Sequence, residues 1–139
     1  MKTFNFVKIL LFTVVTLGFA SCGDDVYYTM QNSNNKLCAR TWVEEYVTVD
    51  NELCKHYLKF APDRSGREIF QFYRNGESRP YQEKSLIFDW RWLDADMENM
   101  EMNFGAGDII YFDNVWVREH NLSGKLNGEV VMFVDEAYY

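Results

Sequence analysis

Polar and apolar residues alternate in short runs along most of the chain. In the run 85–93, for example, the even positions Leu86, Phe88, Trp90 and Trp92 are all apolar. A period of two is typical of a β-strand with one buried face. No long segment repeats apolar residues at the spacing of a helix. The pattern therefore predicts an all-β protein.

Turn-forming sequences separate these runs at regular intervals, among them Pro62–Gly66, Asn75–Gly76 and Asn127–Gly128. The expected strands are 42–49, 55–61, 67–74, 85–93, 98–104, 109–112, 115–119, 121–126 and 129–135. Before them, the stretch Ser33–Arg40 is suited to one helical turn with Ser33 as its N-cap. Many short strands with regular turns are typical of a sandwich or a barrel.

The N-terminus has a different pattern, with a continuous apolar run over Ile9–Ala20 after Lys2 and Lys8. This run is shorter than the roughly 20 residues that span a bilayer as a helix. It fits an export signal, and Cys22 follows it after small residues, as in a bacterial lipoprotein cleavage site. An ordinary secretory signal with a chance cysteine is the alternative. We expect Cys22 to carry the lipid anchor.

These features divide the chain into three parts: a signal peptide over residues 1–21, a lipid-anchored tether over 22–36 and one folded domain over 37–139. The net charge of −7 becomes −9 without Lys2 and Lys8. Nucleic-acid binding depends on clustered basic residues, so this charge argues against a nucleic-acid partner. Several acyl chains anchor a protein stably, so the membrane is the expected partner of the N-terminus.

Two cysteines remain besides Cys22. In an oxidising compartment, Cys38 and Cys54 are candidates for a disulfide, which would contribute about 3 kcal/mol by constraining the unfolded chain. Two free thiols are the alternative. A zinc site with His56 is a third, although Cys38, Cys54 and His56 lack the paired spacing of a structural zinc site. We expect no metal and no cofactor.

Aromatic residues make up 17% of the chain, and they form the main candidate for a binding site. The candidate ligand-binding residues are Trp42, Tyr46, Phe88, Trp90, Trp92, Met102 and Trp116. They are suited to line an apolar pocket or, where exposed, to stack on sugar rings. Alternating aromatics also commonly form a core. No nucleophile elbow, P-loop or dinucleotide fingerprint is present, so we name no catalytic residue and expect a protein without enzymatic activity.

Several sequence stretches occur in an order that resembles the lipocalin-like lipoprotein domains of Bacteroidetes. They are Leu37–Trp42, Tyr57–Phe60, Phe88–Trp92, Met100–Phe104, Gly107–Asp108 and Leu122–Leu126. The acidic Gly23–Asp25 is similar to the surface-export signal of lipoproteins in that group. The resemblance implies an antiparallel up-and-down β-barrel of about eight strands, either holding one small ligand or packed solid.

Together these patterns predict an exported binding protein, lipid-anchored to the outer membrane and facing either the periplasm or the cell exterior. Its ligand would be small, apolar or amphipathic. An assembly protein with a filled barrel that binds another envelope protein is the second hypothesis. A glycan-acting enzyme is the third, and it would need two carboxylates held in a cleft.

Overall fold

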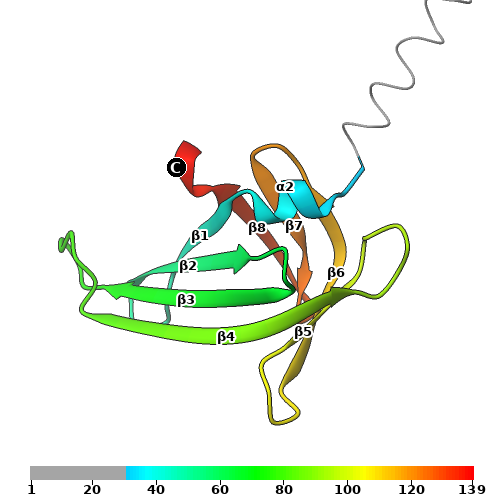
Figure 1. Ribbon diagram of the computed structural model, residues 1–139. Helices are drawn as coiled ribbons and strands as arrows, with labels where there is room; N and C mark the ends of the chain where they lie inside the picture. The colour runs from blue at the N-terminus through cyan, green and yellow to red at the C-terminus, as the bar shows by residue number, and fades with distance from the viewer. Residues whose placement is uncertain (1–30) are drawn as a thin grey trace, which may run out of the picture. The chain divides into compact units, whose positions relative to one another are not determined.

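The computed structural model describes residues 31–139, which fold into a closed antiparallel barrel of eight strands (Figure 1). Each strand pairs with the next along the chain, and β8 pairs with β1. The strands are β1 Thr41–Val47, β2 Leu53–Phe60, β3 Ser65–Tyr73, β4 Gln82–Trp92, β5 Met100–Asn103, β6 Ile109–Val117, β7 Asn121–Leu126 and β8 Glu129–Asp135. The predicted fold class, an all-β up-and-down barrel, is confirmed.

Most predicted strands lie within a few residues of the observed ones, and the last two, β7 and β8, match at both ends. The runs 109–112 and 115–119 form a single strand, β6, instead of two. A register shift between Asp113 and Trp116 bends β6 without ending it. Such a β-bulge inserts an extra residue on one strand of an antiparallel pair.

The chain enters the barrel through a short helix, α2 (Asn34–Cys38), as predicted. The Ser33 side chain accepts a hydrogen bond from the backbone N–H of Lys36 and caps the helix. The folded unit begins at Asn32, earlier than the predicted boundary at 37. The predicted signal peptide, Cys22 and most of the tether lie outside the described residues. Within residues 31–139, no helix is both long and apolar enough to cross a bilayer.

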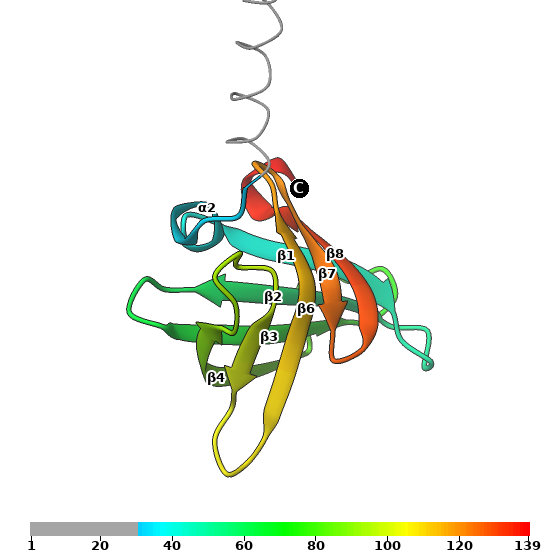
Figure 2. The same cartoon turned by 90° about the vertical axis from the view of Figure 1, so that its right-hand side faces the viewer.

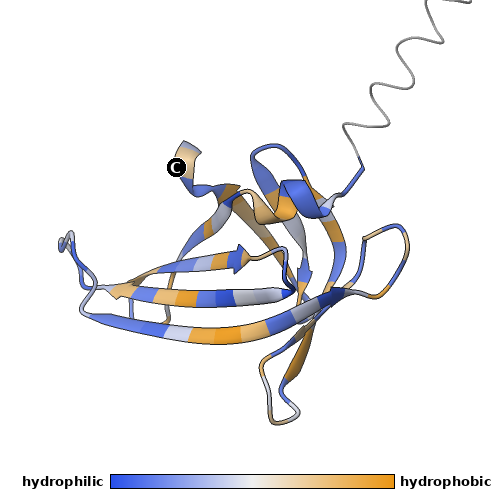
Figure 3. Ribbon diagram, in the orientation of Figure 1, coloured by the Kyte–Doolittle hydropathy of each residue, from blue (hydrophilic) through white to orange (hydrophobic). Residues whose placement is uncertain are grey.

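The connections divide between the two ends of the barrel (Figure 2). The helix end holds α2, the β2–β3, β4–β5 and β6–β7 connections and the final 3₁₀ helix, η1 (Glu136–Tyr138). The far end holds the four hairpin turns β1–β2, β3–β4, β5–β6 and β7–β8. Because strand residues alternate inward and outward, apolar and polar segments alternate along each strand (Figure 3).

The barrel closes through a narrow seam between its first and last strands. Only Trp42 and Val43 of β1 pair with β8, opposite Asp135 and Val134. By contrast, seven residue pairs join β1 to β2. Beyond Val43 the two strands diverge toward the far end (Figure 1). The barrel is therefore tightly closed at the helix end and loosely joined at the far end.

Candidate functional site

The helix end of the barrel is a packed core. Trp42, Phe88, Trp90 and Met102, four of the predicted ligand-binding residues, are buried there together. Trp92 is partly buried and packs against the same cluster. At this end, the predicted aromatic residues therefore form a packed core and do not line a pocket. This is the alternative given above for alternating aromatic residues.

Hydrogen bonds fix the three indoles of this core. The Nε1–H of Trp42 donates to the Leu37 carbonyl at 3.0 Å, and that of Trp90 donates to the Ser65 carbonyl at 2.9 Å. The Nε1–H of Trp92 donates to the Asn34 side chain at 2.7 Å. Two of the three acceptors lie on α2, so this helix is part of the closure of the barrel.

The remaining two predicted residues lie elsewhere. Tyr46 is 42% exposed and lies toward the far end of β1. Trp116 is 46% exposed on the outside of the barrel. The bulge in β6 shifts the alternation, so that Val115 and Val117 point inward and Trp116 points outward. The structure does not bring the seven residues into one pocket.

Cys38 and Cys54 are both free thiols, so the predicted disulfide is not formed. Cys54 lies opposite Tyr46 in the β1–β2 register, whereas Cys38 lies beyond Thr41 at the other end of β1. Tyr46 is five positions after Thr41 along the strand, a distance of roughly 16 Å. Disulfides need Cα atoms within about 7 Å of each other.

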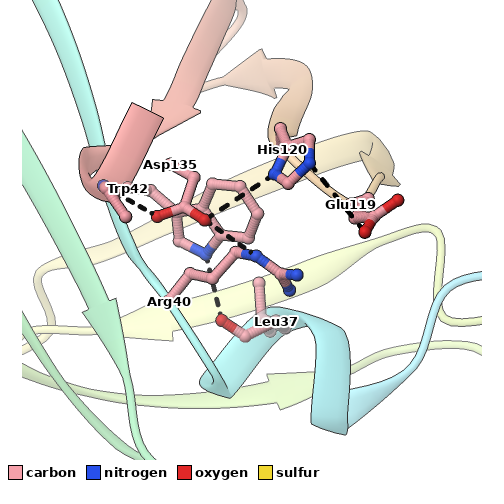
Figure 4. Close-up of polar contacts among 7 residues, drawn as sticks. Leu37, Arg40, Trp42, Glu119, His120 and Asp135 are labelled. Carbon is pink, nitrogen blue, oxygen red and sulfur yellow. Dashed lines mark hydrogen bonds and ion pairs between the residues drawn. The ribbon is translucent and has the colours of Figure 1, made fainter. Parts of the chain in front are cut away.

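A polar cluster holds the last residue of β8 at the helix end (Figure 4). The Arg40 guanidinium donates from Nε to the Asp135 carboxylate at 2.9 Å. The other oxygen of Asp135 accepts from the Ala137 N–H at 3.1 Å and caps η1. The His120 ring packs against the Tyr138 ring at a tilt of 39°, with 3.8 Å between centroids. These contacts tie the two chain ends of the folded unit together, which is a structural role.

A second polar cluster lies inside the barrel, toward its far end, and is the candidate site. His56 on β2 is 4% exposed and lies between two carboxylates. Its Nδ1 is 2.9 Å from Glu44 Oε1, and its Nε2 is 2.7 Å from Glu68 Oε1. Glu44 is directly opposite His56 on β1, and Glu68 is on β3. We call Glu44, His56 and Glu68 the interior triad.

Apolar rings hold the imidazole in place. The His56 ring stacks on Phe70 with 4.3 Å between centroids and 9° between planes. Phe133 of β8 contacts it edge-on at 5.2 Å. The imidazole is therefore held by Phe70 on one face, by the contact with Phe133 and at both nitrogens, and it has little freedom to turn.

The triad favours the protonated form of His56. Burial by itself lowers the pKa of His56, but the hydrogen bonds and charges of Glu44 and Glu68 outweigh it and raise the pKa above the ordinary value of 6.5. A neutral imidazole has one donor, whereas an imidazolium donates from both nitrogens, as two carboxylate partners require. With His56 charged, the triad carries one unbalanced negative charge.

Tyr46 and Cys54 lie next to the triad on the way to the far end. The Tyr46 hydroxyl is hydrogen-bonded to the Cys54 thiol, and burial raises the pKa of both groups. Both therefore remain neutral near pH 7. Among residues 31–139, no Lys or Arg side chain pairs with Glu44 or Glu68.

The triad is not arranged as a metal site. The described residues include no group of three or more His, Cys, Asp and Glu side chains able to hold a metal ion. The two carboxylates contact opposite nitrogens of one ring, so they do not converge on a common point.

Alternation along β2 places His56 on the same face as Cys54, Leu58 and Phe60. The pairing with Glu68 was missed. The available signal was that Glu68 shares an inward face with Phe70. A carboxylate on an apolar face indicates a buried polar contact.

Comparisons with family models, with curated proteins and with solved structures found no match to this chain. The fold and the interior triad therefore carry the functional argument.

Proposed function

We propose that this protein is a lipid-anchored envelope protein whose barrel binds a small amphipathic ligand at its far end. The anchor follows from the Cys22 pattern. The observation that carries the binding role is the interior triad, a charged cluster in the wall of an otherwise apolar barrel. Such a cluster adds little to the stability of the fold, because replacing a buried ion pair by apolar residues of similar volume often leaves a protein as stable or makes it more stable.

The chemistry of the ligand follows from the surroundings of the triad. One unbalanced negative charge, with no Lys or Arg pairing among the described residues, favours a group rich in hydrogen-bond donors, such as an amine. Glu44 retains 19% side-chain exposure, against 8% for Glu68, so Glu44 is the carboxylate a ligand reaches first.

The apolar part of the ligand would lie against neighbouring rings. Tyr46 is exposed, and the side chains of Phe70 and Phe72 are partly buried on the inward face of β3. Leu86 on β4 lies opposite Glu68 and is partly buried too. Apolar walls with a few well-placed polar groups are typical of small-molecule sites.

Native mass spectrometry of the protein purified from its own cells tests this proposal. We expect a reproducible extra mass that is released on denaturation. Glu44→Gln should remove it, because the variant loses the exposed charge. Glu45→Gln is the matched control: Glu45 is the next residue on β1, points outward and pairs with Lys55 at 3.4 Å. A bare mass for the unmodified protein, or equal loss in both variants, would contradict the proposal.

The seam favours a second candidate function, an assembly protein that binds another envelope protein. Past Val43, β1 has no pairing with β8, so both strands present backbone groups along an edge. Such edges accept an added strand from a partner. Co-purification of one fixed partner with a ligand-free barrel would favour this function over ligand binding.

A further inference from the structure

A groove runs along the outer face of the barrel across β6, β7 and β8. It has a volume of about 400 Å³, within the size range of small-molecule sites. Trp116 and Met132 contribute apolar walls, and Asn114, Ser123 and Lys125 contribute polar groups. The groove is on the outside of the wall, so it is separate from the interior triad.

The bulge in β6 puts Trp116 into this groove. Regular alternation from Phe112, which is buried, would turn Trp116 inward. The register shift after Asp113 instead points Val115 and Val117 inward and exposes Trp116, with Asn114 in a left-handed conformation at φ 51°. Bulges that redirect a side chain are common beside functional sites.

The exposed indole is held in a defined orientation. Its Nε1–H donates to the Asn114 side chain at 3.3 Å. The Arg118 guanidinium lies 4.5 Å from the ring centroid, a cation–π contact. Arg118 does not line the groove, so its contact leaves the groove side of the ring open. A large, rigid, exposed aromatic surface of this kind is suited to stacking.

Polar groups flank this surface without partners of their own. Ser123 is directly opposite Trp116 in the strand register, and Met132 is opposite Ser123. Within residues 31–139, no side-chain hydrogen bond or ion pair is formed by Ser123 or Lys125. A purely apolar ligand would cover these groups and leave them without hydrogen-bond partners, which is unfavourable.

We propose that this groove binds a sugar ring of a glycan. A pyranose presents a flat apolar C–H face together with a rim of hydroxyl groups. The C–H face stacks on the groove side of Trp116, and the hydroxyls bond to Ser123 and Lys125. This proposal stands on the bulge and the groove, and it does not depend on a ligand inside the barrel.

The four tryptophans of the chain provide a direct test. Each indole N–H gives one cross-peak in a proton–nitrogen correlation spectrum, and Trp116→Phe assigns the peak of Trp116. The probes are maltose and the disaccharide of N-acetylglucosamine. We expect one of them to shift the Trp116 peak saturably, while the peaks of Trp42, Trp90 and Trp92 stay in place because their N–H groups bond inside the fold.

Variants test the contacts by calorimetry with the same probe. Trp116→Ala should weaken binding about tenfold or more through lost stacking. Ser123→Ala should weaken it by a smaller factor. Tyr111→Ala is the matched control, because Tyr111 is equally exposed on β6 and does not line the groove. Preserved dispersion of the other indole peaks shows that each variant is folded.

Three results would overturn the proposal. One is the absence of any shift with either disaccharide. Another is a shift of the buried indoles in place of Trp116, which would put the sugar inside the barrel. The third is a response of Trp116 to phosphatidylcholine vesicles but not to either sugar, which would assign the groove to membrane contact.

Discussion

At the scale of single residues, the most informative one is His56. Its two nitrogens contact carboxylates from the two neighbouring strands, β1 and β3, and its ring stacks on Phe70. Local sequence showed only that His56 faces inward with Cys54. The carboxylate partners are twelve residues away in each direction, so only strand register brings them together.

This arrangement makes stability depend on pH. The pKa of His56 is raised on folding, so its contribution is fully present below the unfolded value of 6.5 and is lost as pH rises through the folded pKa. We expect the free energy of unfolding to fall between about pH 5.5 and about pH 8.5. Denaturant titrations at both pH values measure it.

Two variants show which histidine causes the pH dependence of the free energy of unfolding. His56→Gln should remove the decrease in stability that comes from the interior triad. His120→Gln should retain it, because His120 is at the helix end, near Asp135 and Tyr138. An equal pH dependence in the protein and in His56→Gln would show that the triad does not hold an extra proton in the folded state.

At the scale of elements, the closure of the barrel depends on the segment before β1. The Asn32 side chain donates to the Met97 and Val115 carbonyls, each at 2.6 Å, and accepts from the Val117 N–H at 2.8 Å. This one amide joins the entry segment to β6 and to the β4–β5 connection. The sequence around Asn32 is Asn-rich and polar, so its pattern alone does not reveal this role.

Asn32→Ala should therefore destabilise the domain more than the polar sequence around Asn32 would indicate. It removes three hydrogen bonds, at about 1 kcal/mol each, and leaves a buried N–H without a partner. We expect a loss of about 2–4 kcal/mol in denaturant unfolding. Ser33→Ala, which removes only the helix cap, should cost about 1 kcal/mol. A smaller effect for Asn32→Ala than for Ser33→Ala would show that the entry segment does not close the barrel.

At the scale of the whole molecule, the barrel has two unlike halves. The helix end is packed with aromatic rings and closed by α2, and the far end carries the interior triad and the open part of the seam. The proposal of an interior ligand depends on this division, since a barrel packed throughout would leave no place for such a ligand. The proposal for the outer groove does not depend on it.

Amide hydrogen exchange should show how far the seam between β1 and β8 is paired. β8 pairs with β7 along its length, from Asn121–Val134 to Leu126–Glu129, but meets β1 only at Val134 and Asp135. Between Glu129 and Phe133, amides directed at β7 should be protected and those directed at β1 should exchange fast. Residue-resolved exchange by NMR measures this. Uniform protection along β8 would show that the seam is closed in solution.

The sequence by itself determined the class of fold, most strand positions and the helical turn capped by Ser33. These follow from local alternation, turn residues and capping, which act over a few neighbouring positions. It also indicated that Leu86, Phe88, Trp90 and Trp92 share one face of β4.

Only the tertiary structure decided how distant positions meet. Register brought Glu44 and Glu68 to His56, and it kept Cys38 away from Cys54. A single bulge in β6 moved Trp116 from the interior to the outer groove. Strand alternation depends on counting residues from a neighbour, so one inserted residue reverses every later side chain. Pairing between strands decides where the inserted residue falls, and the local sequence pattern does not contain that pairing.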